Sequence, residues 1–142
     1  MTPIPVTGFS HLRLTVTDLA RSRAFSDALF GWDVAYEVPA AADDATREAL
    51  GFLYGGIIYS WPGGLLGLRP VARSGDAFSE DRVGLDHLSM TVGSVADLQA
   101  AVAALDALGA THGEVKDLGE ISILEFRDPD GVALELTAPS GA

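Results

Sequence analysis

Gly8-Phe9-Ser10-His11-Leu12-Arg13-Leu14-Thr15-Val16 is the stretch that decides the fold, because it returns later in the chain as Gly84-Leu85-Asp86-His87-Leu88-Ser89-Met90-Thr91-Val92. The two copies align without gaps, and the glycine, histidine, leucine, threonine and valine are identical at matching positions. Such self-similarity indicates two copies of one structural unit. We therefore expect the two halves of the chain to fold alike.

Apolar and polar residues alternate in both copies, which predicts a strand with one face on a core. In the first copy the leucines and the last valine share one face, and the histidine, arginine and threonine share the other. The second copy follows the same alternation. His11 and His87 are therefore expected to project from the polar faces of their strands.

A helix is expected after each of these strands. Asp18 can cap a first helix whose apolar residues recur at helical spacing until Gly31 ends it. Ser94 and Asp97 have the pattern of a capping box at the start of the second helix, and Gly109 marks its end. Each half thus begins with a strand followed by an amphipathic helix.

The rest of each half has the pattern of strands and turns. In the first half we expect a strand over 32–38, a loop over 39–46, and strands over 52–61 and 65–69. This order of elements predicts a βαβββ module.

The second half repeats that order. Strands are expected over 113–116, 120–127 and 132–138, and Asp128-Pro129-Asp130-Gly131 has the pattern of a type I turn that closes a hairpin. The sequence thus predicts an α+β fold of two tandem βαβββ modules.

The length of 142 residues suits a single domain, 1–142, that contains both modules. We place the first module at 8–70 and the second at 84–139. Between them, residues 71–83 are polar and are expected to form a linker.

The composition narrows the classes of function. The chain has 20 Asp and Glu against 9 Lys and Arg, a net charge of −11, which argues against a nucleic-acid partner. No secretory signal pattern is visible, and the uncharged stretch 49–68 is broken by glycines and a proline, so we expect a cytoplasmic protein without a membrane partner. Without cysteine, any transition metal must rest on Asp, Glu or the three histidines, His11, His87 and His112.

With these features the sequence resembles the vicinal oxygen chelate superfamily, which includes glyoxalases, extradiol dioxygenases, fosfomycin-resistance enzymes and bleomycin-resistance proteins. The resemblance covers nearly the whole chain. It rests on the paired Gly-x-x-His-Leu strand starts, on segment 82–87, and on Phe126-Arg127-Asp128-Pro129-Asp130-Gly131 followed by Leu134-Glu135-Leu136. It implies curled mixed sheets that form an open cup, and a homodimer.

In metal-dependent members of that superfamily the ligands come from the first and last strands of each module. His11, His87 and Glu135 match three of these positions, so the resemblance implies one divalent ion, either Fe, Mn, Ni, Co or Zn. Gly67 aligns with Glu135 at the fourth position, and 61–72 contains no carboxylate, amide or imidazole. A four-ligand glyoxalase site is therefore not expected.

Other residues are candidates for contact with a substrate. Glu37 and Glu125 are candidate general bases, since members of the superfamily move a proton beside the metal. Arg13 could face an anionic group, and Tyr59 and Trp61 could line a binding cleft. The structural alternatives are solvated carboxylates for the glutamates and core packing for the aromatic rings.

Together these features favour a glyoxalase-like, metal-dependent enzyme that acts as a Lewis acid on a small oxygenated substrate, as a lyase, isomerase, dioxygenase or resistance-type transferase. Strand 120–127 lacks the His and Tyr that extradiol members use, and no segment has the pattern of the potassium-binding loop of fosfomycin thiol transferases. The competing hypothesis is a metal-free protein, similar to bleomycin-resistance proteins, that binds and sequesters a drug or natural product.

Overall fold

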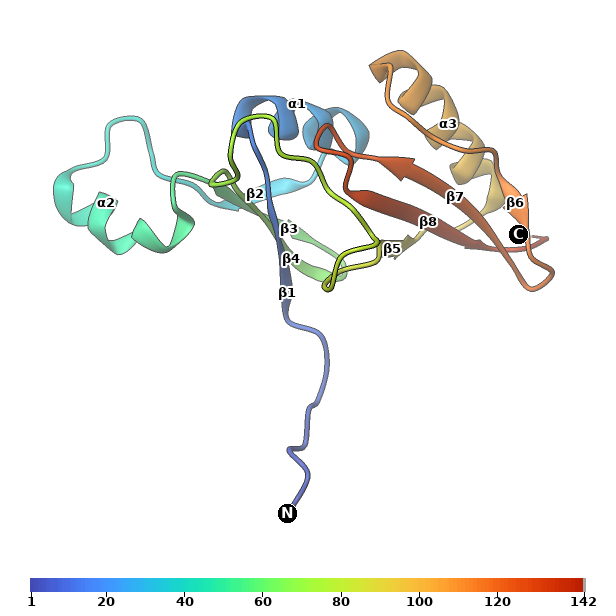
Figure 1. Cartoon of the computed structure of the whole chain (residues 1–142), viewed down its shortest axis with the longest axis horizontal. Coiled ribbons are helices and arrows are strands. Elements are labelled where there is room, and N and C mark those ends of the chain that lie inside the picture. The colour runs from blue at the N-terminus through green and yellow to red at the C-terminus, as the bar shows by residue number, and fades with distance from the viewer. Residues whose placement is uncertain (142) are drawn as a thin grey trace. The chain divides into compact units, whose positions relative to one another are not determined.

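A computed structural model describes residues 1–141 and contains two four-stranded mixed sheets with the same strand order (Figure 1). The elements in chain order are β1 (His11–Thr15), α1 (Leu19–Leu29), β2 (Asp33–Tyr36), α2 (Asp44–Ala49), a short 3-10 turn η1 (Gly51–Leu53), β3 (Ile57–Trp61), β4 (Gly64–Arg69), β5 (Leu88–Thr91), α3 (Val95–Leu108), β6 (Lys116–Asp117), β7 (Ile121–Arg127) and β8 (Ala133–Pro139). The predicted α+β fold of two repeated modules is confirmed. No helix within residues 1–141 is long and apolar enough to cross a membrane.

The first sheet has the order β1-β4-β3-β2. β1 and β4 are parallel, and the other neighbours are antiparallel. Leu14 pairs with Leu68 across the parallel ladder, and both are buried together with Val16. The predicted alternation of β1 is therefore observed: its leucines face a core, and His11, Arg13 and Thr15 face the other way.

The second sheet repeats this pattern with the order β5-β8-β7-β6. α3 lies along one face of it (Figure 1), where Leu98 and Leu105 are fully buried. The predicted caps of α3 are confirmed, because the Ser94 hydroxyl accepts a hydrogen bond from the Asp97 N–H and Gly109 ends the helix in the left-handed conformation. Leu134 and Leu136 lie on the apolar face, which leaves Glu135 on the other.

α1 packs on the second sheet. Phe25 and Phe30 place their rings 6.5 and 6.4 Å from the ring of Phe126 in β7. Arg21 donates to the buried carboxylate of Asp130 at 2.6 Å. The helix of the first module thus supplies part of the core of the second sheet.

The chain therefore divides into two compact units that do not coincide with the predicted modules. Unit 1 is Met1–Leu19 with Trp32–Ala72, and unit 2 is Ala20–Gly31 with the chain from Arg73 onward. Residues 71–83 contain neither helix nor strand. The module boundaries themselves stay a prediction.

Two local predictions in the first half were wrong. The expected loop over 39–46 ends early, because the Asp43 side chain accepts the Thr46 N–H at 2.8 Å and starts α2. The expected strand over 52–61 begins only at Ile57. Its first residues form η1, after which Tyr54 and Gly55 both adopt positive φ and turn the backbone.

The turn over 128–131 closes the β7–β8 hairpin as predicted. The Gly131 N–H donates to the Asp128 carbonyl at 3.0 Å, and Gly131 has a φ of 81°. The buried Asp128 carboxylate also accepts the N–H groups of Asp130 and Val132. This turn sets the register that pairs Glu125 with Glu135.

Candidate functional site

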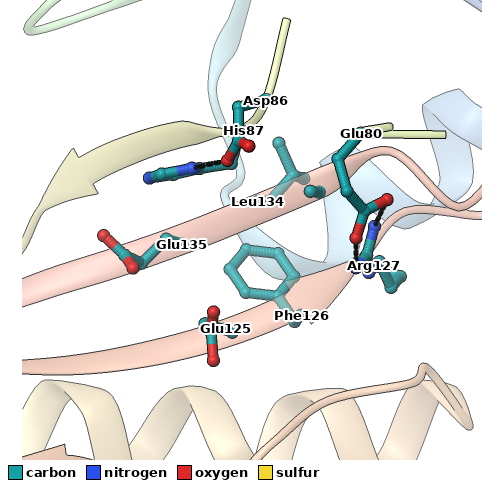
Figure 2. Close-up of a pocket in the computed structure, with 9 residues that line it drawn as sticks. Glu80, Asp86, His87, Glu125, Phe126, Arg127, Leu134 and Glu135 are labelled. Carbon is teal, nitrogen blue, oxygen red and sulfur yellow. Dashed lines mark hydrogen bonds and ion pairs between the residues drawn. The ribbon is translucent and has the colours of Figure 1, made fainter. Parts of the chain in front are cut away.

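Unit 2 brings three of the predicted site residues to one polar face. Ser89 pairs with Glu135 and Glu125 pairs with Glu135 in the sheet, so these side chains share a face, and His87 has the same parity as Ser89. Figure 2 shows His87, Glu135 and Glu125 in one pocket. We call this the His87 pocket; its volume is about 80 Å³ and its lining residues are Glu80, Asp86, His87, Glu125, Phe126, Arg127, Ala133, Leu134 and Glu135.

The imidazole of His87 is held by the residue before it. Its Nδ1 lies 2.5 Å from a carboxylate oxygen of Asp86. This hydrogen bond raises the pKa of His87, and the nearby charges of Glu135 and Glu125 act in the same direction. When Nδ1 donates its proton to Asp86, Nε2 keeps the lone pair that a metal or a proton requires.

The carboxylate of Glu135 accepts a hydrogen bond from a hydroxyl that is itself hydrogen-bonded to a second hydroxyl. Thr137 donates to Glu135 Oε1 at 3.2 Å, and the Thr137 hydroxyl is 2.7 Å from that of Ser89 on the neighbouring strand. Hydrogen bonds of this kind hold a ligating carboxylate in one orientation. Glu135 is therefore a positioned side chain rather than a freely solvated one.

Glu125 lies directly opposite Glu135, and two carboxylates in that position repel each other. Lys116 offsets this repulsion, because its ammonium group lies 2.6 Å from Glu125 Oε2. The hydrogen bond from Lys116 and its charge lower the pKa of Glu125. Glu125 therefore lies in the same pocket as His87, where a general base for a bound substrate would lie. Because its pKa is lowered, Glu125 is a weaker base than an ordinary glutamate.

One wall of the His87 pocket is an ion pair between the linker and β7 (Figure 2). Glu80 accepts two hydrogen bonds from Arg127, at 2.5 and 3.1 Å. This bidentate contact lowers the pKa of Glu80 to about 2. Arg127 also donates to the Gly131 carbonyl, so the pair joins the linker to the β7–β8 turn.

Glu80→Gln should change how stability depends on pH. Because the pKa of Glu80 is lower in the folded protein than its ordinary value of 4.5, its contribution is present above about pH 4.5 and is lost as the pH falls through about 2. Urea unfolding should therefore give a higher midpoint for the wild type than for the variant at pH 6 and equal midpoints near pH 2. A difference that stays constant across this range would contradict the assigned pairing.

His11 lies in unit 1 and has the same kind of anchor as His87. Its Nδ1 is 3.0 Å from the Ser10 hydroxyl, and Ser10 precedes His11 as Asp86 precedes His87. His11 lines a second cavity of about 360 Å³, which we call the Tyr36–Phe52 pocket; its lining residues are His11, Leu12, Arg13, Tyr36, Phe52, Ile58, Leu65 and Gly67.

The ladder of unit 1 supports the alignment of Gly67 with Glu135. Gly67 pairs with Arg13, just as Glu135 pairs with Ser89, the residue that matches Arg13 in the repeat. A Cβ atom at Gly67 would lie 2.9 Å from Cγ of Arg13. Arg13 thus occupies the space beside this position, and Gly67 offers no fourth ligand.

Arg13 already makes hydrogen bonds to the backbone within unit 1. Its two terminal nitrogens donate to the carbonyls of Phe52 and Leu53, at 2.9 and 3.2 Å. The guanidinium group therefore holds η1 against β1. It stays at the edge of the pocket, but fewer of its donors are available to an anionic ligand than the sequence suggested.

The two predicted aromatic contacts lie on the opposite face of the sheet. Tyr59 pairs with Leu66, which shares the apolar face with Leu14, and it is fully buried. Trp61 has the same parity, and its ring packs 5.4 Å from that of Trp32. Core packing, the structural alternative, describes both residues in this structure, and neither lines the Tyr36–Phe52 pocket.

Two further polar candidates lie outside both pockets. Glu37 follows β2 and is exposed, and neither pocket lining contains it. His112 donates or accepts hydrogen bonds with the Gly113 carbonyl and the Asp106 carboxylate, which ties its loop to the end of α3. This is a structural role for His112.

Sequence reasoning missed several residues of the two pockets. Ser10 and Asp86 could have been found, because they occupy matching positions before the two histidines. Tyr36 gave no such signal. Phe52 belongs to an aromatic run that the sequence offers for a cleft, but its partnership with Tyr36 depends on η1, which was predicted as strand. Their rings lie 6.2 Å apart in an edge-to-face arrangement.

The imidazole and carboxylate groups present are chemical types that bind divalent metal ions. His87 and Glu135 supply an imidazole and a carboxylate within unit 2, and His11 supplies a second imidazole in unit 1. No group of three His, Asp or Glu side chains that could hold a metal ion occurs within residues 1–141. The complete ligand set therefore stays a prediction.

Two repeated βαβββ modules, with a histidine at the start of the first strand of one and just before the first strand of the other, define a recognisable class of protein. A family model described as the Glyoxalase/Bleomycin resistance protein/Dioxygenase superfamily matches residues 8–136. The chain belongs to this superfamily. No protein among those of curated function matches it significantly.

Solved structures support the same fold. A glyoxylase/bleomycin resistance protein/dioxygenase domain from Frankia sp. EAN1pec is 30% identical, with a TM-score of 0.75 and 96% of each chain covered. The fosfomycin resistance protein FosX from Listeria monocytogenes is 17% identical, with a TM-score of 0.69 and coverage of 96% and 94%. FosX from Mesorhizobium loti is 16% identical, with a TM-score of 0.66 and coverage of 96% and 95%. The two FosX proteins share the fold with this chain.

Proposed function

We propose that this protein is a divalent-metal-dependent enzyme that acts on a small oxygenated substrate, with His11, His87 and Glu135 as the metal ligands. The observation that carries the proposal is the matched anchoring of the two histidines. Ser10 and Asp86 engage Nδ1 at equivalent positions of the repeat, which leaves Nε2 of each ring for a metal. Histidines kept only as relics of duplication would not need this shared anchor.

The side chains around Glu135 support the same proposal. Thr137, itself hydrogen-bonded to Ser89, donates to its carboxylate, and Lys116 neutralises Glu125 beside it. Of these two carboxylates, Glu125 rather than Glu135 accepts the hydrogen bond from Lys116. A bound ion would supply Lewis-acid stabilisation of negative charge on substrate oxygens.

Manganese is the first metal to test. A Listeria monocytogenes FosX variant, 19% identical to this chain, was crystallised with Mn(II) and 1S,2S-dihydroxypropylphosphonic acid. His, Glu and open positions suit Mn(II), Fe(II), Co(II), Ni(II) and Zn(II) alike. With Gly67 in place of a fourth ligand, the proposed site keeps more positions open for substrate and water than a four-ligand site.

Metal binding should be visible as thermal stabilisation. The full chain is treated with a chelator, dialysed, and melted with and without each of the five ions and with Mg(II) as control. We expect at least one transition ion to raise the melting temperature with increasing concentration, because an ion that binds only the folded state stabilises it. No shift with any of them, and no stoichiometric metal in protein purified without chelator, would refute the proposal.

We also propose that the protein is a homodimer, as its family membership suggests. His11 then meets His87 and Glu135 either of the same chain or of a second copy. Mixing the His11→Ala and Glu135→Ala variants separates these cases. Recovery of metal binding on mixing means that two copies share each site, and no recovery means that each chain builds its own.

The second candidate function is a metal-free binding protein for a drug or natural product. The observation that favours it is the Tyr36–Phe52 pocket, whose walls are mainly apolar and whose volume of about 360 Å³ suits a small molecule. A ligand whose affinity is unchanged by His87→Ala and by chelator treatment would favour this function over the enzyme.

A further inference from the structure

The Tyr36–Phe52 pocket has the size of a binding site for an organic ring system. Its volume is about 360 Å³, whereas a protein cavity of roughly 150 Å³ is enough to hold benzene. All of its lining residues belong to unit 1, from β1, β2, η1, β3 and β4. One rigid sheet with its short 3-10 turn therefore forms the pocket.

The walls of this pocket are apolar. Ile58 and Leu65 lie along the sheet on the His11 face, and the rings of Tyr36 and Phe52 complete the lining. These two rings are 47% and 48% exposed, although they pack against each other. Exposed aromatic rings at the mouth of a cavity gain free energy when an apolar ligand covers them.

Gly67 lines the pocket without a side chain of its own. A Cβ atom there would lie 3.3 Å from Ile58 and 2.9 Å from Arg13, so these two side chains already fill the space beside Gly67. The equivalent residue in unit 2 is Glu135. The same position of the fold thus carries a carboxylate in one unit and no side chain in the other.

The pocket offers few hydrogen-bond donors to a strongly anionic ligand. Arg13 is the single Lys, Arg, Asp or Glu among its lining residues, all of which lie in the described part of the chain. Both of its terminal nitrogens already donate to backbone carbonyls. A phosphonate dianion would lose its water and gain few new donors, which is unfavourable.

We infer that this pocket binds the uncharged, ring-bearing part of the substrate, so that the substrate class is an aromatic or alicyclic oxygenated molecule rather than a small phosphonate. The inference rests on the proposed function only in calling this molecule a substrate. His11 at the edge of the pocket would then lie next to the oxygen-bearing end of the ring.

Calorimetric titration with 2-naphthol, an uncharged ring probe, tests the inference, with methylphosphonate as the anionic comparison. The full chain is used in two forms, chelator-treated and Mn(II)-loaded. We expect one 2-naphthol per chain in both forms and no competition from methylphosphonate. Phe52→Ala should weaken binding about tenfold, because it removes one ring of the lining.

Phe9→Ala is the matched control, since Phe9 is an exposed phenylalanine of unit 1 that does not line the pocket. It should leave the affinity within about twofold, and Tyr36→Ala should repeat the loss seen for Phe52→Ala. Equal effects of Phe9→Ala and Phe52→Ala, no binding of 2-naphthol, or tighter binding of methylphosphonate would each overturn the inference.

The two proposals can fail separately. If no metal binds but 2-naphthol behaves as expected, the metal-dependent function is wrong and the ring-binding pocket stands. If Mn(II) binds stoichiometrically and 2-naphthol does not bind, the substrate class is wrong and the metal site stands.

Discussion

His87→Ala should lower the affinity of the protein for Mn(II) by about 100-fold or more. Losing even a residue that only orients a metal ligand typically costs about 10- to 100-fold in affinity, and the proposal makes His87 a ligand itself. Its removal leaves Glu135 without the imidazole that shares its pocket. Equilibrium dialysis against Mn(II), at a pH where the histidines are neutral, measures the change.

His112→Ala is the control for that experiment. His112 is also a histidine with a carboxylate partner, Asp106, but it does not line the His87 pocket. Its substitution should leave Mn(II) affinity unchanged, and Asp86→Asn should lower it about tenfold. Equal losses for His112→Ala and His87→Ala would show that the effect is not specific to the proposed ligands.

Phe126→Ala should lower the free energy of unfolding by about 3–5 kcal/mol. The Phe126 side chain is 2% exposed, and it is the residue of β7 that contacts both Phe25 and Phe30 of α1. Its truncation removes apolar contacts on both sides and leaves a cavity between the helix and the sheet. Urea denaturation with a two-state fit gives the value.

Two further variants make that result specific. Phe126→Leu keeps most of the volume and should cost less than half as much. Phe9→Ala removes an exposed ring and should change stability by no more than about 0.5 kcal/mol. If Phe126→Ala were as mild as Phe9→Ala, α1 would not be packed on the second sheet as the structure describes.

The fold was largely predictable because the sequence contains the same strand pattern twice. Matching residues around His11 and His87 predict equivalent strands, and the caps of α3 at Ser94 and Gly109 are local signals. α2 was missed since its start depends on one capping bond from Asp43 within an alanine-rich stretch. The pairing of α1 with the second sheet was not predictable, because an amphipathic helix shows which face it buries but not which sheet it meets.

The site was predictable where strand parity was clear. Glu135 lies between two leucines, and its polar orientation follows from that alternation. Tyr59 lies in a strand with buried residues on both faces, Ile57 to Tyr59, so alternation could not show which way it points. The apolar pocket depends on where η1 places Phe52, which is a property of the folded backbone.

Pulsed electron paramagnetic resonance of the Mn(II)-loaded protein tests the central claim most directly, because it counts the imidazole nitrogens bound to the ion. The proposed ligand set predicts one Mn(II) per chain with two imidazole nitrogens in the wild type, and one nitrogen in each of the His11→Ala and His87→Ala variants. A wild-type protein that binds no stoichiometric Mn(II), or binds it without imidazole nitrogen, would contradict the claim.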